Sequence, residues 1–321
     1  MISIGGENLI DLVSGDHDAN GLPRYVANPG GSPFNVAIAA GRQGQDVAYL
    51  TPVSEDALGV LLAERLVESK VALAAPRAPH PTSLAVVSIT DGIPSYAFHR
   101  NATAERQISL AGLDRDMPAG TRLFHVGSLA LIGGEDADAW EAFFAACRDR
   151  GIMTSLDPNV RPGLITDRED YVARIRRMLC HADIVKLSDE DLVWLYPDRP
   201  LEAALADCRA DSDAVLFILT MGGDGSRLFL DQRDAGKGGG TEIKAAAPAI
   251  DDLADTVGAG DTYMASILCW ALENGLTSRS ALAGIDEAAL TKAATRAGEA
   301  AAINCQRSGC NPPWREELVT I

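Results

Sequence analysis

The sequence predicts an α/β protein whose mostly parallel sheet is covered by helices on both faces. Short apolar runs alternate with amphipathic helical patterns over most of the chain, and this alternation is typical of parallel strands joined by helical crossovers. The chain has 321 residues, of which 47% are hydrophobic. It can therefore bury a large core, either as one large domain or as two of ordinary size.

The expected strands and helices alternate along the chain. The strands are the apolar runs at 2–5, 47–53, 122–127, 152–157, 183–188 and 214–220. Between them, apolar residues recur every three or four positions, which predicts helices at 33–43, 56–68, 136–150, 168–180 and 200–210. The pattern at 136–150 starts with acidic residues and ends with basic ones before Gly151, as the helix dipole favours.

Two segments interrupt this alternation. Residues 82–100 read as two strands joined by a turn, and residues 9–25 begin as a strand and become polar with several turn formers. Both are interpreted as excursions into a small β layer, which are either surface hairpins or the cover of a cleft. The glycine-rich run at 236–241 is expected to be a mobile hairpin loop.

Charge and composition exclude several classes of protein. The 45 acidic residues outnumber the 28 basic ones, and the formal charge of −17 disfavours binding to nucleic acid or to an anionic membrane. The six cysteines contain no CxxC pair and are expected to be buried free thiols. No signal peptide pattern and no apolar run of about 18 residues is visible, so we expect a cytoplasmic protein.

The stretch DTVGAGDTYMASIL at 255–268 combines glycines with the start of a helical pattern. Gly258, Ala259 and Gly260 would stand at the helix N-terminus, where unpaired amides and the helix dipole favour an anion. Glycine also lets the backbone approach that anion closely. The alternative is a glycine turn that Asp261 simply caps.

Asp261 repels a phosphate, so it is a poor phosphate ligand. It fits the role of a general base that takes the proton of a hydroxyl as this hydroxyl attacks phosphorus. The P-loop pattern GxxxxGK[ST] is absent, and IGGENLI at 4–10 lacks the third glycine of a dinucleotide fingerprint.

A second glycine-rich stretch, NPGGSPFNVAIAAGRQG at 28–44, also precedes a helical pattern. Asn35 lies on the first turn of that helix, and its amide can both donate to and accept from neighbouring sugar hydroxyls. It could equally cap the helix or face solvent.

Together these stretches resemble the two signatures of the ribokinase-like (PfkB) family of sugar kinases, and the resemblance covers nearly the whole chain. It implies a single domain over 1–321, with a three-layer α/β/α fold and a small β lid formed by the excursions at 9–25 and 82–100. It also implies that Gly258, Ala259 and Gly260 form the anion hole and that Asp261 is the catalytic base. The sugar contacts fall on Asp11, Gly31 and Asn35.

The same resemblance implies MgATP as the phosphoryl donor and suggests a potassium requirement. Nucleotide contacts would come from two glycine-rich regions and from the segment KLSDEDL, where Ser188-x-x-Asp191 replaces the family's Asn-x-x-Glu motif. A turn between two strands is the alternative reading of residues 220–226. The implied nucleotide residues are Lys186, Ser188, Thr220, Gly222, Gly223, Gly225, Asn304 and Gly309, the implied magnesium residue is Asp191, and the implied potassium residues are Asp255 and Val257.

Details of the pocket resemble the fructokinase branch of that family. SYAFHRNATAE and SLDPNVRPGL imply that Arg100, Asn159 and Arg161 lie near the sugar, although Arg161 could instead form a structural salt bridge. Ser32-Pro33 follows the paired glycines, which favours an unphosphorylated sugar. Fructose is the expected substrate. The alternatives are ribose, 2-keto-3-deoxygluconate or another sugar, and a sugar-sensing protein without turnover; a homodimer through the lid is a further implication.

Overall fold

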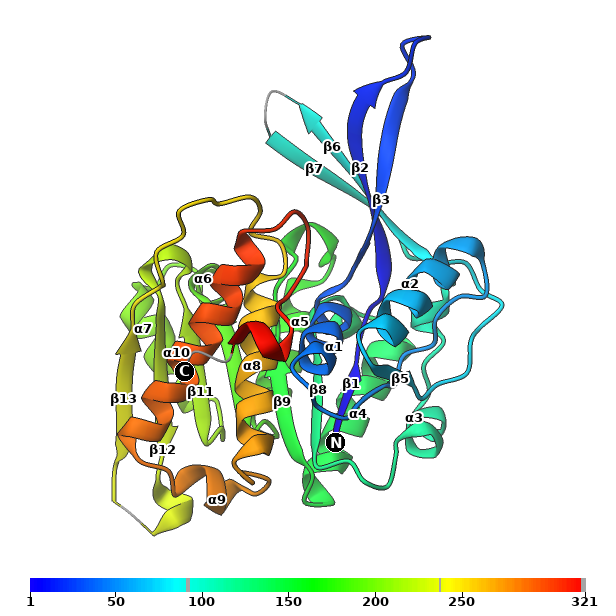
Figure 1. Ribbon diagram of the computed structural model, residues 1–321. Helices are drawn as coiled ribbons and strands as arrows, with labels where there is room; N and C mark the ends of the chain where they lie inside the picture. The colour runs from blue at the N-terminus through cyan, green and yellow to red at the C-terminus, as the bar shows by residue number, and fades with distance from the viewer. Residues whose placement is uncertain (91–92, 237, 319–321) are drawn as a thin grey trace.

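Thirteen strands in two separate sheets are found in the computed structural model, which describes residues 1–90, 93–236 and 238–318 (Figure 1). The large sheet has the order β13-β12-β11-β10-β9-β8-β1-β4-β5. Its neighbours pair in parallel, except for the antiparallel pairs β11–β12 and β12–β13. Its strands are β1 (Ile2–Gly5), β4 (Val47–Tyr49), β5 (Val71–Leu73), β8 (Leu123–Gly127), β9 (Met153–Asp157), β10 (Ile184–Ser188), β11 (Leu216–Thr220), β12 (Ser226–Asp231) and β13 (Gly240–Ala245).

Helices cover both faces of the large sheet, and a separate hydrophobic core fills each interface (Figure 1). Successive strand residues point to opposite cores, so that Leu123 and Ile184 join one core and Phe124 and Val185 the other. The first core is covered by α1 (Ser32–Arg42), α2 (Ala57–Glu68), α8 (Ala259–Glu273), α9 (Arg279–Ala283) and α10 (Glu287–Cys305). The second is covered by α3 (Leu110–Asp116), α4 (Glu135–Asp149), α5 (Arg168–Leu179), α6 (Asp189–Leu195) and α7 (Leu201–Ala210).

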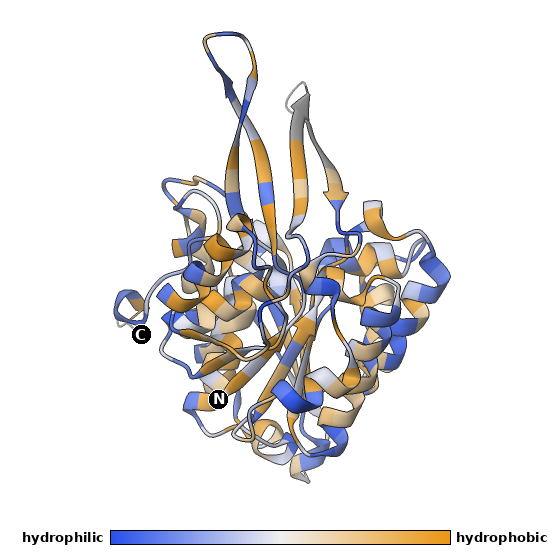
Figure 2. Ribbon diagram, turned by 90° about the vertical axis from the view of Figure 1, so that its right-hand side faces the viewer, coloured by the Kyte–Doolittle hydropathy of each residue, from blue (hydrophilic) through white to orange (hydrophobic). Residues whose placement is uncertain are grey.

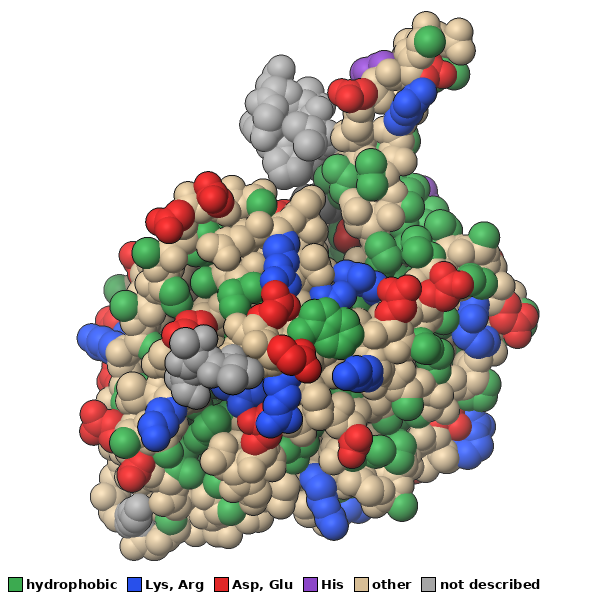
Figure 3. All heavy atoms as spheres, viewed as in Figure 1, with side chains coloured by type: hydrophobic (Ala, Val, Ile, Leu, Met, Phe, Trp, Pro, Cys, Tyr) green, Lys and Arg blue, Asp and Glu red, His purple; other side chains and the backbone are tan. Residues whose placement is uncertain are grey.

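The small sheet projects from the carboxyl end of β1 and has the order β3-β2-β6-β7 (Figures 1 and 2). It consists of two antiparallel hairpins joined by the parallel pairing of β2 with β6. Its strands are β2 (Leu9–His17), β3 (Pro23–Gly30), β6 (Ser83–Thr90) and β7 (Ile93–His99). Leu12, Ala27 and Leu84 lie on the face that packs against the first core, and Figure 3 shows hydrophobic side chains gathered at the root of this sheet.

The predicted α/β architecture is confirmed, with a mostly parallel sheet, two helical layers and a small β layer. Most predicted elements begin and end within one or two residues of the observed ones. The strand expected at 47–53 is shorter, because the chain leaves the sheet after Tyr49. The loop expected at 236–241 is partly wrong, since Gly240 and Thr241 begin β13 and pair with β12; Lys237 lies outside the described residues.

The expectations about cysteines and membranes can also be compared with the fold. All six cysteines are free, and four of them are buried: Cys147, Cys208, Cys269 and Cys305. Of the helices that the structure describes, none has the length and apolar character needed to cross a membrane.

Candidate active site

Two predicted site residues, Ser188 and Thr220, lie where parallel strands end, and so does Asp157, which had no predicted role. In register, Asp157 at the end of β9 lies opposite Gly127 of β8, and Ser188 at the end of β10 lies opposite Thr220 of β11. Ligands of open α/β sheets bind outside this carboxyl edge. The large sheet therefore places these residues on one rim, below the small sheet.

Asp261 lies in the first turn of α8 and is only 6% exposed. The Ser32 hydroxyl donates to its Oδ1 at 2.7 Å, and the Asn35 amide donates to its Oδ2 at 2.8 Å. The two glycine-rich signatures therefore meet, because α1 and α8 pack side by side. Burial raises the pKa of Asp261, and the two hydrogen bonds partly oppose that rise. Asp261 does not cap α8, so the simple capping interpretation is wrong.

The backbone before Asp261 has the features expected of an anion site. Gly258 precedes α8 with a φ of 76°, a left-handed conformation that glycine adopts without strain. Within the described ranges, the amides of Gly258, Gly260 and Asp261 have no acceptor, whereas the Ala259 amide donates to the Thr256 carbonyl at 3.2 Å. Three free amides thus converge at the positive end of a 15-residue helix.

A buried ion pair lies directly beside these amides. Lys186 on β10 donates to the Asp157 carboxylate at 2.7 Å, and both side chains are almost completely buried. A Cβ atom on Gly260 would lie only 3.3 Å from the Lys186 ammonium. Although burial opposes its charge, the carboxylates of Asp157, Asp191 and Asp261 together raise the pKa of Lys186. The site therefore holds a cation next to the candidate anion hole.

Ser188 and Asp191 form the cap of a helix. The Ser188 hydroxyl accepts from the Asp191 amide at 3.0 Å, and Asp191 Oδ2 accepts from the Ser188 amide at 2.9 Å. Asp191 Oδ1 accepts from the Val160 amide at 2.7 Å. Both carboxylate oxygens of Asp191 are thus bonded to backbone amides, while the buried Oδ1 of Asp157 has no partner within the described part of the chain.

Asp11 lies on β2 of the small sheet, close to the junction with β1. Its carboxylate lies against Gly30, where a Cβ atom would come within 2.3 Å of Oδ2. Burial raises the pKa of Asp11 to about 6, and the charge of Arg161 opposes this rise. Arg161 donates to the Asn159 side chain at 2.5 Å, and Asn159 has a φ of 39°. Asn159 and Arg161 are therefore in contact, and the charge of Arg161 is felt at Asp11; Arg161 forms no ion pair within the described residues, and its place in the sugar pocket stays a prediction.

Arg100 lies at the end of β7, close to the same region, but its guanidinium is already engaged. It binds both carboxylate oxygens of Glu105 at 2.9 and 3.1 Å and donates to the Leu129 carbonyl at 3.2 Å. The side chain is 9% exposed. In this arrangement Arg100 has a structural role, because its guanidinium is held by Glu105 and by the Leu129 carbonyl.

The segment at 220–226 forms the turn between β11 and β12. The Met221 amide donates to the Gly225 carbonyl at 2.8 Å, and Gly222 and Gly225 have φ values of 52° and 89°. A Cβ atom on Gly225 would lie 2.1 Å from the Ala245 carbonyl oxygen, whereas Gly222 and Gly223 face open space. The turn interpretation explains these glycines, and it leaves an open surface at the carboxyl edge beside Thr220.

The loop before α8 is fastened to the loop after α10. Asp255 accepts from the amides of Val257 and Gly309, each at 3.0 Å. Asn304 is fully buried, donates to the Val257 carbonyl at 2.8 Å and accepts from the Asn311 amide at 2.8 Å. These bonds fix the positions of Asp255 and Val257, the residues predicted to bind potassium. The described residues contain no cluster of three or more His, Cys, Asp or Glu that could hold a metal ion alone.

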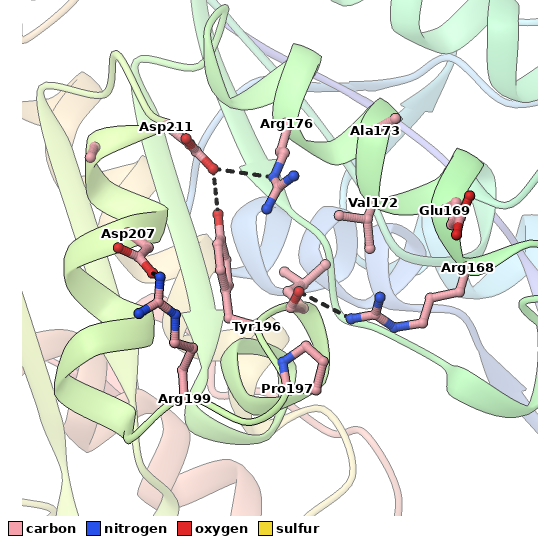
Figure 4. Close-up of a pocket in the computed structure, with 12 residues that line it drawn as sticks. Arg168, Glu169, Val172, Ala173, Arg176, Tyr196, Pro197, Arg199, Asp207 and Asp211 are labelled. Carbon is pink, nitrogen blue, oxygen red and sulfur yellow. Dashed lines mark hydrogen bonds and ion pairs between the residues drawn. The ribbon is translucent and has the colours of Figure 1, made fainter.

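A hollow of about 700 Å³ lies elsewhere, between α5, α6 and α7 (Figure 4). Its charged side chains pair with one another, as in Arg176–Asp211 at 3.2 Å and Arg199–Asp207 at 2.9 Å. The Tyr196 hydroxyl also donates to Asp211 at 2.8 Å. None of the predicted site residues lines this hollow, and its polar groups are explained by the packing of the three helices.

The sequence interpretation missed the partners of the predicted residues. Ser32, Asp157, Glu7 and Glu105 contact predicted site residues, yet none of them was assigned a role. Asp157 carried a usable signal, because it ends a predicted strand at the edge where ligands bind. The role of Ser32 depends on the packing of α1 against α8, which no local pattern reveals.

The arrangement has three parts: a buried carboxylate, free amides at a helix start and a buried ammonium. A carboxylate with a raised pKa can accept a proton from an alcohol. The amides and the ammonium can stabilise negative charge that develops next to it. These are the requirements for transfer of a phosphoryl group to a hydroxyl.

Comparisons with known proteins agree with this chemistry. A model of the pfkB family carbohydrate kinases matches residues 2–317. A fructokinase of Rhizobium leguminosarum bv. trifolii is 37% identical over 298 residues, which cover 90% of this chain and 85% of that protein. Among solved structures, the fold is similar to fructokinase with bound ATP from Xylella fastidiosa, with a TM-score of 0.84, 22% identity and coverage of 99% and 97%. It is also similar to fructokinase from Vibrio cholerae O395 in its fructose, ADP and calcium ion bound form, with a TM-score of 0.78, 25% identity and coverage of 96% and 94%.

Proposed function

Because the chain belongs to the pfkB family of carbohydrate kinases and is an ATP-dependent sugar kinase, we propose that it phosphorylates fructose. The γ-phosphoryl group of MgATP passes to the primary hydroxyl at O6, and the products are fructose 6-phosphate and ADP. The P–O bond to the leaving ADP breaks, the P–O6 bond forms, and the hydroxyl proton goes to the protein.

One observation supports this proposal above the others. The buried Asp261 carboxylate lies in the turn that presents the free amides of Gly258 and Gly260, and Ser32 and Asn35 fix its orientation. A proton acceptor and an anion site within one helical turn suit a hydroxyl that attacks a phosphoryl group.

In the proposed reaction Asp261 takes the proton from O6, and the amides of Gly258, Gly260 and Asp261 stabilise the charge on the transferring group. Lys186 adds a cation at the same place. Magnesium, when bound, neutralises the triphosphate. It would be held mainly by phosphate oxygens, with Asp157 and Asp191 acting through water. Asp255 and the Val257 carbonyl would hold potassium if the enzyme requires it, and no step of the proposed reaction passes through that ion.

Support for the sugar site comes from the root of the small sheet. Asp11 accepts hydrogen bonds from sugar hydroxyls, Gly31 contributes backbone groups where β3 leads into α1, and Arg161 and Asn159 complete the sugar contacts. The Asn35 Oδ1 atom is buried and has no partner in the described ranges, so it is available to a sugar hydroxyl. Arg100 stabilises the structure around this sugar site through its ion pair with Glu105. The small sheet acts as the lid that excludes water during transfer.

For the nucleotide, the proposal uses the open turn at the end of β11. Thr220, Gly222, Gly223 and Gly225 contact ATP on one side, and Ser188 lies beside them at the end of β10. Asn304 and Gly309 shape the adenine side by holding the loop after α10 in place.

We also propose that two copies pair through the small sheet. Apolar side chains on its β2–β3 hairpin face solvent, including Leu22 at 62%, Tyr25 at 45% and Val26 at 57% exposure. Tyr25 and Val26 lie on opposite faces of β3, and exposed apolar side chains on a projecting hairpin suit an interface between copies. Light scattering of the protein and of the Tyr25→Ser/Val26→Ser variant tests this, and a wild-type monomer contradicts it.

Fructose is favoured by the 37% identity to a protein named fructokinase. Ser32-Pro33 places no basic residue beside the paired glycines, which favours an unphosphorylated sugar of any kind. An ADP-release assay over fructose, ribose, 2-keto-3-deoxygluconate and other sugars tests the choice. We expect the highest kcat/KM with fructose and a product phosphorylated at O6 by NMR. A higher value with another sugar contradicts the substrate. Binding of sugar and ATP without ADP release contradicts catalysis.

A further inference from the structure

The junction between the two sheets is a three-residue link, Gly6 to Asn8, that leads from β1 into β2. The Tyr49 hydroxyl donates to the carbonyls of Gly6 and Glu7 at 2.7 and 3.0 Å. Thr51 bonds both the amide and the carbonyl of Gly6, at 2.9 and 2.7 Å. The root of the small sheet is therefore clamped to the large sheet by side chains of β4 and the residues after it.

Glu7 sends its side chain from this link to the start of α1. Its Oε1 accepts from the Ser32 amide at 2.9 Å, and the residue is 1% exposed. Helix α1 has no acidic residue in its first turn, and its N-cap residue, Gly31, has no side chain to cap it. Glu7 thus supplies from a distant segment both the acceptor and the negative charge that a helix N-terminus favours.

The residue capped by Glu7 also contacts the proposed base. Ser32 gives its amide to Glu7 and its hydroxyl to Asp261, at 2.9 and 2.7 Å. Gly31 leaves no room between the two segments, because a Cβ atom there would lie 2.5 Å from the Glu7 carbonyl oxygen. A chain of direct contacts therefore runs from the root of the small sheet, through the first turn of α1, to Asp261.

Glu7 also has an uncommitted oxygen in charged surroundings. Its buried Oε2 has no hydrogen-bond partner in the part of the chain that the structure describes. Burial raises the pKa of Glu7 to about 7, while Arg100 and the Ser32 amide oppose this rise and Glu105 adds to it. The other titratable groups around it are Tyr49, Tyr171 and, through Ser32, Asp261.

We propose that Glu7 is a positioning residue, whose carboxylate caps α1 from the root of the small sheet and so holds Ser32 against Asp261. The proposal depends on the assignment of Asp261 as the proton acceptor. Ionised Glu7 attracts the N-terminus of α1, and neutral Glu7 attracts it less. Turnover should therefore be faster when Glu7 is ionised, which occurs as the pH rises through 7.

The test compares Glu7→Gln and Glu7→Ala with the wild-type enzyme from pH 6 to pH 8. Glutamine keeps an acceptor for the Ser32 amide but stays neutral, so it should match the wild-type kcat at pH 6 and be about 3- to 10-fold slower at pH 8. Alanine removes the cap and should lower kcat about 10- to 30-fold, with KM for ATP within about threefold. The pH-dependent difference between Glu7→Gln and wild type is a result that loss of packing alone does not give, because glutamine fills the same space as glutamate.

Asp286→Asn is the control, since Asp286 is an acidic cap of a different helix, α10, where its side chain accepts from the Ala289 amide at 2.8 Å. It should leave the ratio of kcat at pH 8 to kcat at pH 6 at the wild-type value. If Glu7→Ala does not fold, Glu7→Gln alone decides the question. A wild-type pH profile for Glu7→Gln, or a lower melting temperature without a change in kcat, overturns the proposal.

Asp261→Asn separates this inference from the proposed function. If that variant is inactive and Glu7→Gln behaves like wild type, only the positioning role of Glu7 fails. If Asp261→Asn keeps normal turnover, the base assignment fails and the positioning role fails with it.

Discussion

The start of α8 and the root of the small sheet hold the two carboxylates of the proposed reaction in different ways. Asp261 is 6% exposed and accepts hydrogen bonds from Ser32 and Asn35. Asp11 is half-buried, and its side chain has no hydrogen-bond partner within the described ranges. The group proposed to move a proton is oriented by the protein before substrate arrives, whereas the group proposed to bind sugar is left open for its ligand.

This difference follows from where each carboxylate lies in the fold. Asp261 belongs to a helix packed between α1 and α10, so neighbouring elements reach it from several directions. Asp11 belongs to a thin sheet, where Leu9 and Ala85 on the same face pack against Leu129 but no described side chain hydrogen-bonds to its carboxylate. Orientation of a reacting group by fixed neighbours is how enzymes gain rate, while a ligand group gains its partners on binding.

The largest effect should come from Asp261→Asn, which removes the proton acceptor and keeps the shape of the side chain. We expect kcat to fall by about 10²- to 10⁴-fold, while sugar binding measured by calorimetry stays within a few-fold. Asp286→Asn, at the exposed cap of α10, is the control and should keep wild-type turnover. Near-normal kcat in Asp261→Asn would show that Asp261 is not the proton acceptor, and its contrast with Asp11 would then have no catalytic meaning.

A stability effect of similar size is expected for Lys186→Met, because it leaves the buried Asp157 charge unpaired. Loss of one partner of a buried ion pair costs about 3–5 kcal/mol of unfolding free energy. Lys186→Met/Asp157→Leu, which removes both charges, should lose less. Denaturant unfolding at pH 7 measures both, and an equal or larger loss in the double variant would show that packing dominates.

A smaller effect is expected from a substitution of Asp11, the carboxylate that has no hydrogen-bond partner within the described ranges. Asp11→Asn should raise KM for the sugar about 10- to 100-fold, because a hydrogen bond to a charged group is worth about 1.5–3 kcal/mol. kcat and KM for ATP should change by less than about threefold. Asp16→Asn, which lies at an exposed position of the same strand, is the control. A fall in kcat with unchanged KM would assign Asp11 to the chemical step instead.

The smallest effect is a pH dependence of sugar binding. Burial raises the pKa of Asp11 to about 6, and the ionised form is the better acceptor for sugar hydroxyls. The dissociation constant for the sugar should therefore rise as the pH falls below about 6, by up to tenfold per pH unit. Calorimetry in the absence of nucleotide from pH 5 to pH 8 measures this. Asp11→Asn should bind equally over that range, and a parallel rise in that variant would point to a different group.

The sequence was informative where a function depends on local pattern. Glycines before an apolar helical repeat located the start of α8, and alternating strands and helices predicted the layers. Pairings between distant segments were not predictable in this way. The contact between Ser32 and Asp261 joins residues 229 positions apart, and Glu7 was read only as part of an incomplete dinucleotide fingerprint. Its carboxylate gains a role only once β1 lies beside α1.

Single motifs also left alternative roles open for individual side chains, and only the tertiary structure decides between those roles. Asn35 could cap its helix or face solvent on sequence grounds, and the structure buries it against Asp261. Arg100 was expected near the sugar, and the structure engages its guanidinium with Glu105. The partner of a charged side chain depends on tertiary distance, which neither residue type nor spacing determines.

The position of β2 inside the small sheet has a consequence for selectivity. β2 is bonded to β3 on one edge and to β6 on the other, with Asp11 opposite Asn28 and Ala85. A slip of one residue would turn Asp11 toward α2 and present Leu12 in its place, because alternate side chains point to opposite faces. Pairing with two neighbouring strands thus fixes the face on which Asp11 lies, so the proposed sugar ligand keeps its register although its sheet is thin and outlying.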